Sequence, residues 1–479
     1  MSNSNYRPPI VTVMGHIDHG KTTLLDKIRS ASVASREAGG ITQHVSSYQV
    51  TIDRAGTKKT ITFMDTPGHA AFSAMRSRGA RLTDMVVLVI AATDGIMAQT
   101  KESIEHIKSA DLPVIVAINK MDLDTASPEK VKGQLVEVGL TPEEYGGQVA
   151  CVPVSAKTGK GIDDLLDRIL LQAEVMELVG EPSAELEAVV VESRLDKNRG
   201  PVANVIVKKG TLKQGDQIYA EQITGKVKAL IDSNGKNISA ALPSTPVEIL
   251  GFEAVPQVGS IISTHPNIPQ FTAAPALKID PASPRLRIIV KADVNGSLEA
   301  LLSSLSDDVD VVSSGIGPIS DNDVFVAAAS KTPIYAFNVK TPSSVVKVAN
   351  NEKVKIIESK IIYEILEDIE KKVLKLLEPT IDEDIIGEGR IKAEFKINGT
   401  RIAGVEVTKG EMAKGDTVHL KRDDKIAKDT KIDTIHQAKI TLEKIKATAE
   451  CGMTFKPYVD FKLNDVIISY KKNEEHNSL

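Results

Sequence analysis

The chain has 479 residues, enough for about three or four domains, and its shares of apolar (42%) and charged (26%) residues are ordinary for soluble globular protein. It has neither a run of 18 or more apolar residues nor a secretion or transit signal at its short polar start. We therefore expect no membrane span and a cytoplasmic location. The two cysteines, Cys151 and Cys451, lie far apart in sequence and are expected to be reduced thiols.

The net charge of −5 is unevenly distributed along the chain. Residues 386–472 carry 18 Lys and Arg against 13 Asp and Glu, a net charge of +5, so the remainder carries about −10. A positive segment on an acidic chain suggests that one end of the protein faces nucleic acid. A solvated, lysine-rich surface explains the same charges equally well.

Residues 8–178 alternate apolar runs with helical patterns. The apolar runs are residues 10–14, 61–64, 85–92, 114–118 and 149–154. Several are nearly continuous, as expected for strands that are covered by helices on both faces. The alternation predicts an open, mostly parallel sheet, which binds ligands at the carboxyl ends of its strands.

A phosphate-binding loop follows the first run. The spacing G-x-x-x-x-G-K-[ST] occupies residues 15–22, between a β-branched strand and a helical pattern, which is the context that this motif requires. Its glycines let backbone N–H groups close around an anionic oxygen at a helix N-terminus. Lys21 would reach the β- and γ-phosphates of a nucleotide, and the Thr22 hydroxyl would ligate Mg²⁺. The expected nucleotide contacts here are Gly15, Asp18, His19, Gly20, Lys21, Thr22 and Thr23.

A second loop, residues 37–44, can complete the metal site. Its Thr42 can bring another hydroxyl to Mg²⁺ while a γ-phosphate is present, and release it after hydrolysis. Taken alone, the pair Gly39 and Gly40 indicates only a turn.

A third loop follows the run at residues 61–64 and reads Asp-Thr-Pro-Gly-His. Asp65 would hold the metal through water, and the Gly68 N–H can approach the γ-phosphate because no side chain intervenes. His69 stands where a side chain could orient the attacking water.

Two loops after later strands are typical of guanine recognition. The Asp122 carboxylate can accept from guanine N1–H and from the exocyclic amine, which adenine lacks. Lys120 can lay its methylene stem along the base, and the Ala156 N–H could bind the guanine carbonyl. The expected guanine contacts are Asn119, Lys120, Asp122, Ser155, Ala156 and Lys157.

These four stretches, in this order, resemble the translational GTPases, and more closely bacterial translation initiation factor two. The likeness rests on residues 15–22, 37–44 and 65–72, and extends from about Pro8 to Tyr470. The resemblance implies hydrolysis of GTP to GDP and phosphate, with Mg²⁺ as cofactor. The family's long N-terminal extension is missing from the sequence, so contacts assigned to it are not carried over.

The resemblance also implies partners. A monomer would bind initiator formylmethionyl-tRNA to the small ribosomal subunit in a GTP-dependent way, together with other initiation factors, and promote joining of the large subunit. Thr42 would be the switch threonine. Because no arginine in the chain is placed as an arginine finger, turnover should be slow until the ribosome supplies the missing group, which is worth about 10³–10⁵ in rate.

The sequence predicts a multidomain α/β plus β fold. Its expected parts are a P-loop GTPase domain (8–178), a β-barrel (184–266), a small α/β domain (285–357), a linker helix (358–378) and a C-terminal β-barrel (386–472) as candidate initiator-tRNA-binding domain. A Pro-rich linker occupies residues 266–284, and residues 293–297 are interpreted as a turn and a helix N-cap. The amphipathic helix has two interpretations, a stalk between domains, which the resemblance favours, and simple packing on the preceding domain.

The last barrel repeats a turn of the first. Residues 409–416 have the spacing of residues 209–216, and each turn follows an apolar strand, which suggests two copies of one barrel. A shared turn type would give the same pattern.

The initiator-tRNA pocket of the family matches this chain in part. The matching residues are Glu450, Cys451 and Gly452. Val405 stands where bacterial members often have a cysteine, and residues 436–438 replace a Lys-Arg-aromatic stretch. Fewer cations would weaken contact with RNA phosphates. A solvent-shielded small hydrophobe is the alternative role of Cys451.

Two other functions remain open. An elongation-type GTPase that delivers aminoacyl-tRNA would share the first two domains, but its third domain would consist of β-strands. An RNA-binding assembly factor could use GTP only as a ligand, but the intact His69 and the full switch set argue against it.

Overall fold

The computed structural model describes residues 6–29, 42–54, 56–68, 70–266, 285–377, 383–397, 400–422, 425–437 and 440–472. They belong to two compact units, residues 1–369 and 370–479. Nearly all of the predicted linker at 266–284 lies outside the described residues, and so do His69 and Ala438. No described helix is long and apolar enough to cross a membrane.

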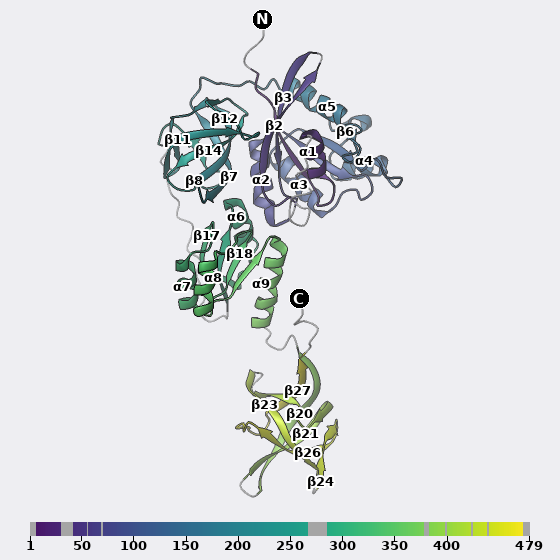
Figure 1. Cartoon of the computed structure of the whole chain (residues 1–479). Coiled ribbons are helices and arrows are strands. Elements are labelled where there is room, and N and C mark those ends of the chain that lie inside the picture. The colour runs from purple at the N-terminus through teal and green to yellow at the C-terminus, as the bar shows by residue number, and fades with distance from the viewer. Residues whose placement is uncertain are drawn as a thin grey trace. The chain divides into compact units, whose positions relative to one another are not determined.

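The first unit begins with a six-stranded sheet in the order β2-β3-β1-β4-β5-β6 (Figure 1). All neighbouring strands are parallel except β2 and β3. The strands are β1 (Ile10–Gly15), β2 (Ser46–Arg54), β3 (Thr57–Asp65), β4 (Met85–Ala91), β5 (Val114–Asn119) and β6 (Ala150–Pro153). The mostly parallel sheet is therefore confirmed.

Helices cover both faces of this sheet. They are α1 (Lys21–Arg29), α2 (Ser73–Leu82), α3 (Ala98–Ser109), α4 (Pro128–Glu137) and α5 (Ile162–Val175), with short 3₁₀ turns η2 (Ala70–Phe72) and η3 (Glu143–Tyr145). Side chains of β4 alternate between two cores: Val87 packs with α1 and α5, whereas Leu88 packs with α2, α3 and α4. Burial on both faces explains why the parallel strands read as continuous apolar runs.

The edge strand β2 was not predicted. Its sequence is polar and half-exposed, so it lacks the apolar signal of the buried strands. It pairs antiparallel with β3, and Ser46 lies opposite Asp65. This register brings the residues just before β2 to the carboxyl end of β3, where the metal loop begins.

Residues 187–263 form a closed barrel. Its ring is β7-β8-β14-β11-β10-β15 and closes because β10 pairs with both β11 and β15. The strands are β7 (Glu187–Asp196), β8 (Gly200–Lys209), β9 (Leu212–Lys213), β10 (Gln217–Ala220), β11 (Ile223–Asp232), β12 (Asn237–Ile238), β13 (Ala240–Ala241), β14 (Pro246–Phe252) and β15 (Ile261–Ser263). An apolar core of its own fills the interior.

A four-stranded parallel sheet, β17-β16-β18-β19, follows the barrel. Its elements are β16 (Leu286–Ala292), α6 (Asn295–Ser303), β17 (Val309–Ile316), α7 (Asp321–Ser330), β18 (Ile334–Phe337), α8 (Ser343–Asn351) and β19 (Ile356–Ser359). Because β19 continues to Ser359, the long helix α9 (Ile362–Leu377) begins later than the predicted residue 358. The Tyr335 hydroxyl donates to Asp368 at 2.6 Å, and Ile365 is buried, so the first half of α9 packs on this domain.

The second unit contains another closed barrel. Its ring is β20-β21-β26-β23-β22-β27, and β20 closes it by pairing with both β21 and β27. The strands are β20 (Glu383–Ile397), β21 (Thr400–Ala413), β22 (Thr417–Arg422), β23 (Lys425–Gln437), β24 (Ile440–Leu442), β25 (Lys444–Lys446), β26 (Glu450–Lys456) and β27 (Val466–Lys472). The barrel starts before the predicted residue 386, because Glu383 pairs with Lys472.

The two barrels are built alike. If β7 is matched to β20 and the other ring strands follow in turn, the two rings have the same strand order. Their repeated turns also agree: the backbone N–H groups of Lys213 and Ala413 each donate at 2.8 Å to an aspartate three residues on. Gly215 and Gly415 have φ of +94° and +89°. The predicted duplication is thus confirmed by topology as well as by turn geometry.

Candidate functional site

The phosphate loop connects the end of β1 to the start of α1. Gly15 and Gly20 adopt φ of +142° and +85°, and Asp18 between them adopts +61°. A Cβ at Gly15 would lie 2.3 Å from the carbonyl oxygen of Val89, so only glycine fits against β4. His19 is 1% exposed, and burial lowers its pKa to about 4. Its imidazole is therefore neutral at pH 7 and packs inside the loop.

Lys21 lies inside this loop as the first residue of α1. Its Nζ donates a hydrogen bond to the carbonyl oxygen of His16 at 2.7 Å, and the residue is 7% exposed. Burial lowers the pKa of the Lys21 ammonium to about 8, against the opposing effect of the Asp65 carboxylate. Nucleotide phosphates would supply the negative charge that stabilises this buried cation.

The lowered pKa of Lys21 predicts that nucleotide binding takes up a proton above about pH 8. Below that pH the lysine is charged with or without nucleotide, so affinity should stay constant. Above it the ligand-free lysine is neutral, whereas bound phosphates would raise its pKa, so GDP affinity should fall by about tenfold per pH unit. Calorimetry near pH 8.5 in two buffers of different ionisation enthalpy measures the uptake. A constant affinity without proton uptake would contradict this prediction.

The hydroxyl oxygens of Thr22 and Thr42 lie 2.5 Å apart. Thr22 belongs to α1, whereas Thr42 comes from the loop at 37–44, of which residues 37–41 lie outside the described part of the chain. Mg²⁺ prefers octahedral oxygen ligands at about 2.1 Å, which sets adjacent ligands about 3 Å apart. With a small widening, the two hydroxyls therefore fit adjacent positions around one Mg²⁺.

Replacing Thr42 by Ala should spare GDP binding but remove the extra order that Mg²⁺ and a GTP analogue give to the loop around residues 35–45. The reason is that the second hydroxyl is needed only when a γ-phosphate is bound. Limited proteolysis of this loop in both nucleotide states measures the order. Thr51→Ala, at an exposed threonine of β2, serves as the control. Equal cleavage of the unmodified protein in both states would show that the loop is not a switch.

Gly68 lies directly against the phosphate loop. A Cβ at this position would be 2.5 Å from Lys21 Nζ and 3.1 Å from the carbonyl oxygen of Gly15, so no larger residue fits without a shift. Asp65 ends β3 nearby, is 4% exposed and raises the pKa of Lys21. The structure thus brings both predicted residues to the phosphate loop. His69 follows Gly68 but lies outside the described residues, so its role stays a prediction.

Asn119 joins the phosphate loop to the loop after β6. Its Nδ2 donates to the carbonyl oxygen of His19 at 2.8 Å, and its Oδ1 accepts from the Ala156 N–H at 2.9 Å. The residue is 2% exposed. In the structure the Ala156 N–H thus donates to Asn119, and its donation to a guanine carbonyl stays a prediction. Asn119 therefore holds two loops in register.

Asp122 presents an ionised carboxylate at the edge of the site. The Ser155 hydroxyl donates to Asp122 Oδ1 at 2.7 Å and holds the pKa of that carboxyl below its usual value. Asp122 is exposed and thus accessible to a base, whereas Ser155 is buried. Lys120 Nζ lies 3.3 Å from Asp94 Oδ2. Two further predicted contacts are exposed: Thr23 and Lys157.

The residue after Thr42 binds the start of α9. Gln43 is 5% exposed; its Nε2 donates to the carbonyl oxygen of Lys360 at 2.9 Å, and its Oε1 accepts from the Ile362 N–H at 3.2 Å. The partners are 317 and 319 residues apart, so no local sequence pattern could indicate the contact.

The next residue, His44, reaches the domain of α6. Its Nε2 lies 2.9 Å from Asp293 Oδ2. The Gly296 N–H donates to Glu192 of β7 at 3.0 Å, and α6 has no side-chain cap. The predicted helix start is confirmed, since α6 begins at Asn295, but the predicted side-chain N-cap is wrong, and the segment 293–297 also joins three domains of the first unit.

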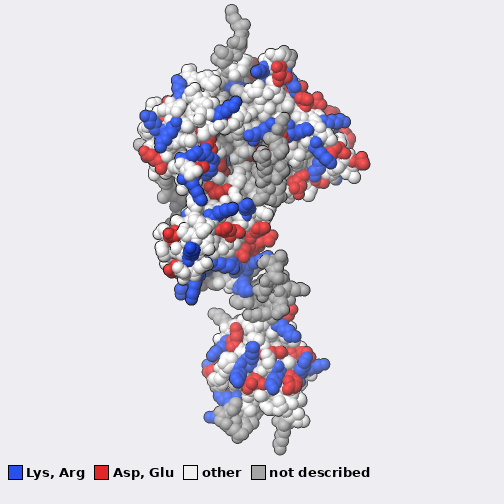
Figure 2. Space-filling view, in the orientation of Figure 1, with Lys and Arg blue, Asp and Glu red and all other residues white. Residues whose placement is uncertain are grey.

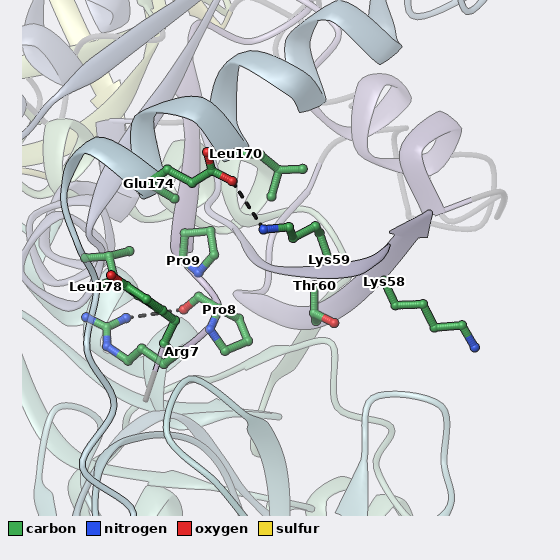
Figure 3. A pocket seen from close by; sticks show the side chains of 11 residues that line it. Arg7, Pro8, Pro9, Lys58, Lys59, Thr60, Leu170, Glu174 and Leu178 are labelled. Atoms are coloured by element: carbon green, nitrogen blue, oxygen red, sulfur yellow. Dashed lines mark hydrogen bonds and ion pairs between the residues drawn. The ribbon is translucent and has the colours of Figure 1, made fainter. Parts of the chain in front are cut away.

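A cavity of about 500 Å³ opens near the starts of β1 and β3, away from the phosphate loop (Figure 3). Two of its charged side chains are paired: Arg7 with Asp84 at 2.7 Å, and Lys59 with Glu174 at 3.2 Å. None of the predicted nucleotide contacts lines it. Because ligands of parallel sheets bind at the carboxyl ends of the strands, the phosphate loop marks the candidate site.

The predicted tRNA contacts lie on β26, between β21 and β23. Cys451 pairs with Val405, and Gly452 pairs with Gly404 on one side and His436 on the other. Two positions at which the chain departs from the family thus border the predicted pocket. Cys451 is 7% exposed in the barrel core, and burial raises its pKa to about 11, which supports its role as a small buried hydrophobe.

The residues that alternate with Cys451 are more accessible, and Glu450 is exposed. A Cβ at Gly404 would lie 2.9 Å from Cε2 of Phe395, and a Cβ at Gly452 would lie 3.0 Å from Cγ2 of Ile402. We call Gly404, Gly452, Phe395 and Ile402 the two-glycine patch. Phe395 is 52% exposed. Phe395 and Ile402 were not predicted as site residues, because their position beside the glycines depends on strand register.

The charges of this barrel are mixed rather than segregated. On the face seen in Figure 2, Lys and Arg are interspersed with Asp and Glu. Several cations are paired, for example Arg401 with Glu394 at 2.6 Å and Arg422 with Asp465 at 2.7 Å. The net charge of +5 therefore does not by itself identify an RNA-binding face.

Family models match three parts of the chain. Residues 7–174 match the elongation factor Tu GTP binding domain, residues 185–265 match elongation factor G domain 2, and residues 276–370 match translation-initiation factor 2. Among solved structures, the chain is similar to GDP-bound aIF5B from Aeropyrum pernix, at 27% identity and a TM-score of 0.48, covering 97% of this chain and 92% of that one.

Curated relatives cover nearly the whole chain. Translation initiation factor IF-2 of Halothermothrix orenii is 44% identical over 504 residues, which cover 99% of this chain and 73% of the relative. The same factor of Rubrobacter xylanophilus is 42% identical over 495 residues, which cover 97% and 71%. At this identity and coverage, the chain belongs to the translation initiation factor IF-2 family and carries the GTPase domain of translational GTPases.

Proposed function

We propose that residues 8–178 hold GTP as its Mg²⁺ complex through the loops described above. The observation that carries this proposal is the contact of the Thr22 and Thr42 hydroxyls beside the buried Lys21. The proposed nucleotide contacts are Gly15, Asp18, His19, Gly20, Lys21, Thr22, Thr23, Asp65, Gly68, Asn119, Lys120, Asp122, Ser155, Ala156 and Lys157. Within this set, Asp122 reads the base, the Ala156 N–H binds the guanine carbonyl, and Asn119 also holds two loops in register. Mg²⁺ would neutralise the charge that develops on the phosphates.

Hydrolysis in this proposal depends on His69 and on the ribosome. His69 orients the attacking water, and Lys21 stabilises the transferred phosphate. Slow turnover in isolation and stimulation by the ribosome follow, because no cis arginine finger is expected from the sequence.

The proposed role in initiation is GTP-dependent binding of initiator formylmethionyl-tRNA to the small ribosomal subunit, followed by joining of the large subunit. The factor would act in the cytoplasm as a monomer, together with other initiation factors. The two-glycine patch supports binding of an aminoacyl end, because the exposed Phe395 ring, which lies over Gly404, can contact an apolar side chain or a planar group. Its neighbour Glu450 would limit access of the acidic phosphates.

A fragment of residues 379–479 tests the tRNA role. It should fold, since the barrel has a closed ring and its own core, and should bind formylated initiator tRNA weakly and in a salt-dependent way. Nuclease protection of formylated and unformylated initiator tRNA measures binding. Phe395→Ala should weaken it, whereas Leu463→Ala, at a similarly exposed apolar residue, should not. A folded fragment that ignores tRNA at low salt would refute this role.

The rival functions make different predictions. An elongation-type factor would need a third domain of β-strands, whereas the chain has the parallel sheet β17-β16-β18-β19 with helices at this place. A non-catalytic assembly factor would bind GTP without ribosome-stimulated turnover. Hydrolysis measured with and without ribosomes separates it from the proposed function.

A further inference from the structure

Arg76 of α2 is an arginine in the GTPase domain that no assigned role accounts for. It is 1% exposed, although arginine is almost never fully buried without partners. Its Nη1 donates to the carbonyl oxygen of Pro67 at 3.1 Å, and its Nη2 donates to Glu102 Oε1 of α3 at 2.5 Å. The guanidinium therefore connects the loop after β3 to two helices.

The contact with Pro67 fixes one particular peptide group. The carbonyl of Pro67 and the N–H of Gly68 belong to the same planar trans peptide, so they point in opposite directions. Arg76 holds the carbonyl, which turns the Gly68 N–H away from α2. Gly68 itself lies against the phosphate loop, within 2.5 Å of Lys21 Nζ when measured from an added Cβ.

The charge of Arg76 also acts on the phosphate loop. The guanidinium contributes to the lowered pKa of Lys21, after the effects of burial and Asp65. Arg76 therefore adds to the positive potential around Lys21.

We propose that Arg76 is a positioning residue that presents the Gly68 amide to the γ-phosphate and so makes the site prefer GTP over GDP. The proposal rests on the proposed function of the phosphate loop. A bidentate guanidinium suits this task, because it can hold the carbonyl and the carboxylate in one plane. The Glu102 carboxylate keeps the guanidinium in place and compensates its buried charge.

The alternative is that Arg76 only ties α2 to α3. Both roles stabilise the fold, but only the positioning role distinguishes the two nucleotides, because GDP has no γ-phosphate for Gly68 to bind. The ratio of the affinities for GDP and for a non-hydrolysable GTP analogue therefore separates them.

The test compares Arg76→Met with three other variants. Arg76→Met should lose at least about tenfold in affinity for the GTP analogue, the value expected for a lost charge-assisted contact, with less than about threefold change for GDP. Arg76→Lys should recover part of the preference, since one ammonium can still bind the Pro67 carbonyl. Arg78→Met breaks another ion pair of α2, with Glu299 at 2.9 Å, and should keep the preference. Glu102→Gln removes the α2–α3 ion pair but leaves an oxygen that can accept from Arg76, so this variant should keep most of the preference for the GTP analogue.

Equal loss of both nucleotides, an unchanged preference in Arg76→Met, or the same loss of preference in Arg78→Met would overturn the proposal. If Arg76→Met does not fold, the double variant Arg76→Met/Glu102→Gln removes both charges and carries the same test. GDP binding itself reports on the proposed function. If the unmodified protein does not bind GDP, the proposed function is refuted. If Arg76→Met binds GDP and keeps the unmodified protein's preference for the GTP analogue, only the role of Arg76 is refuted.

Discussion

Replacing Asp122 by Asn should change the base that the protein binds from guanine to xanthine. In the proposed site, the Asp122 carboxylate would accept from guanine N1–H and from the exocyclic amine, whereas xanthine has a carbonyl in place of that amine. An asparagine oxygen can keep the hydrogen bond from Ser155, which is 2.7 Å long in the structure, and its amide nitrogen can then donate to the xanthine carbonyl. GTP affinity should fall by at least about 10², because two hydrogen bonds to an ionised carboxylate are lost, each worth about 1.5–3 kcal/mol, and xanthosine triphosphate should gain affinity.

Binding of both nucleotides to both proteins measures this change. Asp124→Asn is a matched control, because it removes the same charge from an exposed residue of the same loop. If Asp122→Asn kept its GTP affinity, the guanine-reading role of Asp122 would be refuted. A similar loss in the control would show that net charge, and not recognition of the amine, determines the affinity.

The nucleotide site could be predicted largely because its signals are local. The phosphate loop needs glycines, a lysine and a threonine at fixed spacing, and Gly15 and Gly20 have the positive φ values that this spacing requires. The loops that carry Asp65 and Asn119 could be placed at one edge, since each follows a buried apolar strand of a parallel sheet.

Contacts between distant segments could not be predicted. Asn119 Oδ1 accepts the Ala156 amide because β5 and β6 are adjacent and end together, which sequence spacing does not reveal. The polar edge strand β2 lacks an apolar run, and only its pairing with β3 defines it. The starts of α9 and of the last barrel differ from the predicted residues 358 and 386 for a related reason: β19 continues to Ser359, and Glu383 pairs with Lys472 of β27.

Contacts between domains that bear on function could not be predicted from local sequence either. From its sequence neighbours, Asp293 is interpreted as part of a turn. In the fold, its carboxylate contacts the His44 ring. Gln43 and His44 directly follow Thr42, so the segment that would sense the γ-phosphate also contacts Asp293, just after β16, and the start of α9. A conformational change in this segment would therefore alter the contacts with Asp293 and with the start of α9 at the same time.

Replacing His69 by Ala should leave GTP affinity nearly unchanged and lower ribosome-stimulated hydrolysis by about a hundredfold. His69 directly follows Gly68, whose backbone lies against the phosphate loop, and the proposed function assigns it the water in line with the γ-phosphate. A side chain that only orients water acts near the transition state and contributes little to ground-state binding. Loss of such orientation typically costs about 10² in rate, or roughly 2.7 kcal/mol of barrier.

Single-turnover hydrolysis and light scattering on the same ribosomes separate the two steps that this variant should affect differently. Subunit joining needs only the GTP-bound shape and should survive, while release of the factor should slow. His69→Gln is the informative comparison, because an amide can still hold a water and should retain more activity than alanine. If hydrolysis by His69→Ala equals that of the unmodified protein, another group must orient the water. Arg76, which holds the adjacent Pro67–Gly68 peptide, is then the first residue to test for an indirect role in that step.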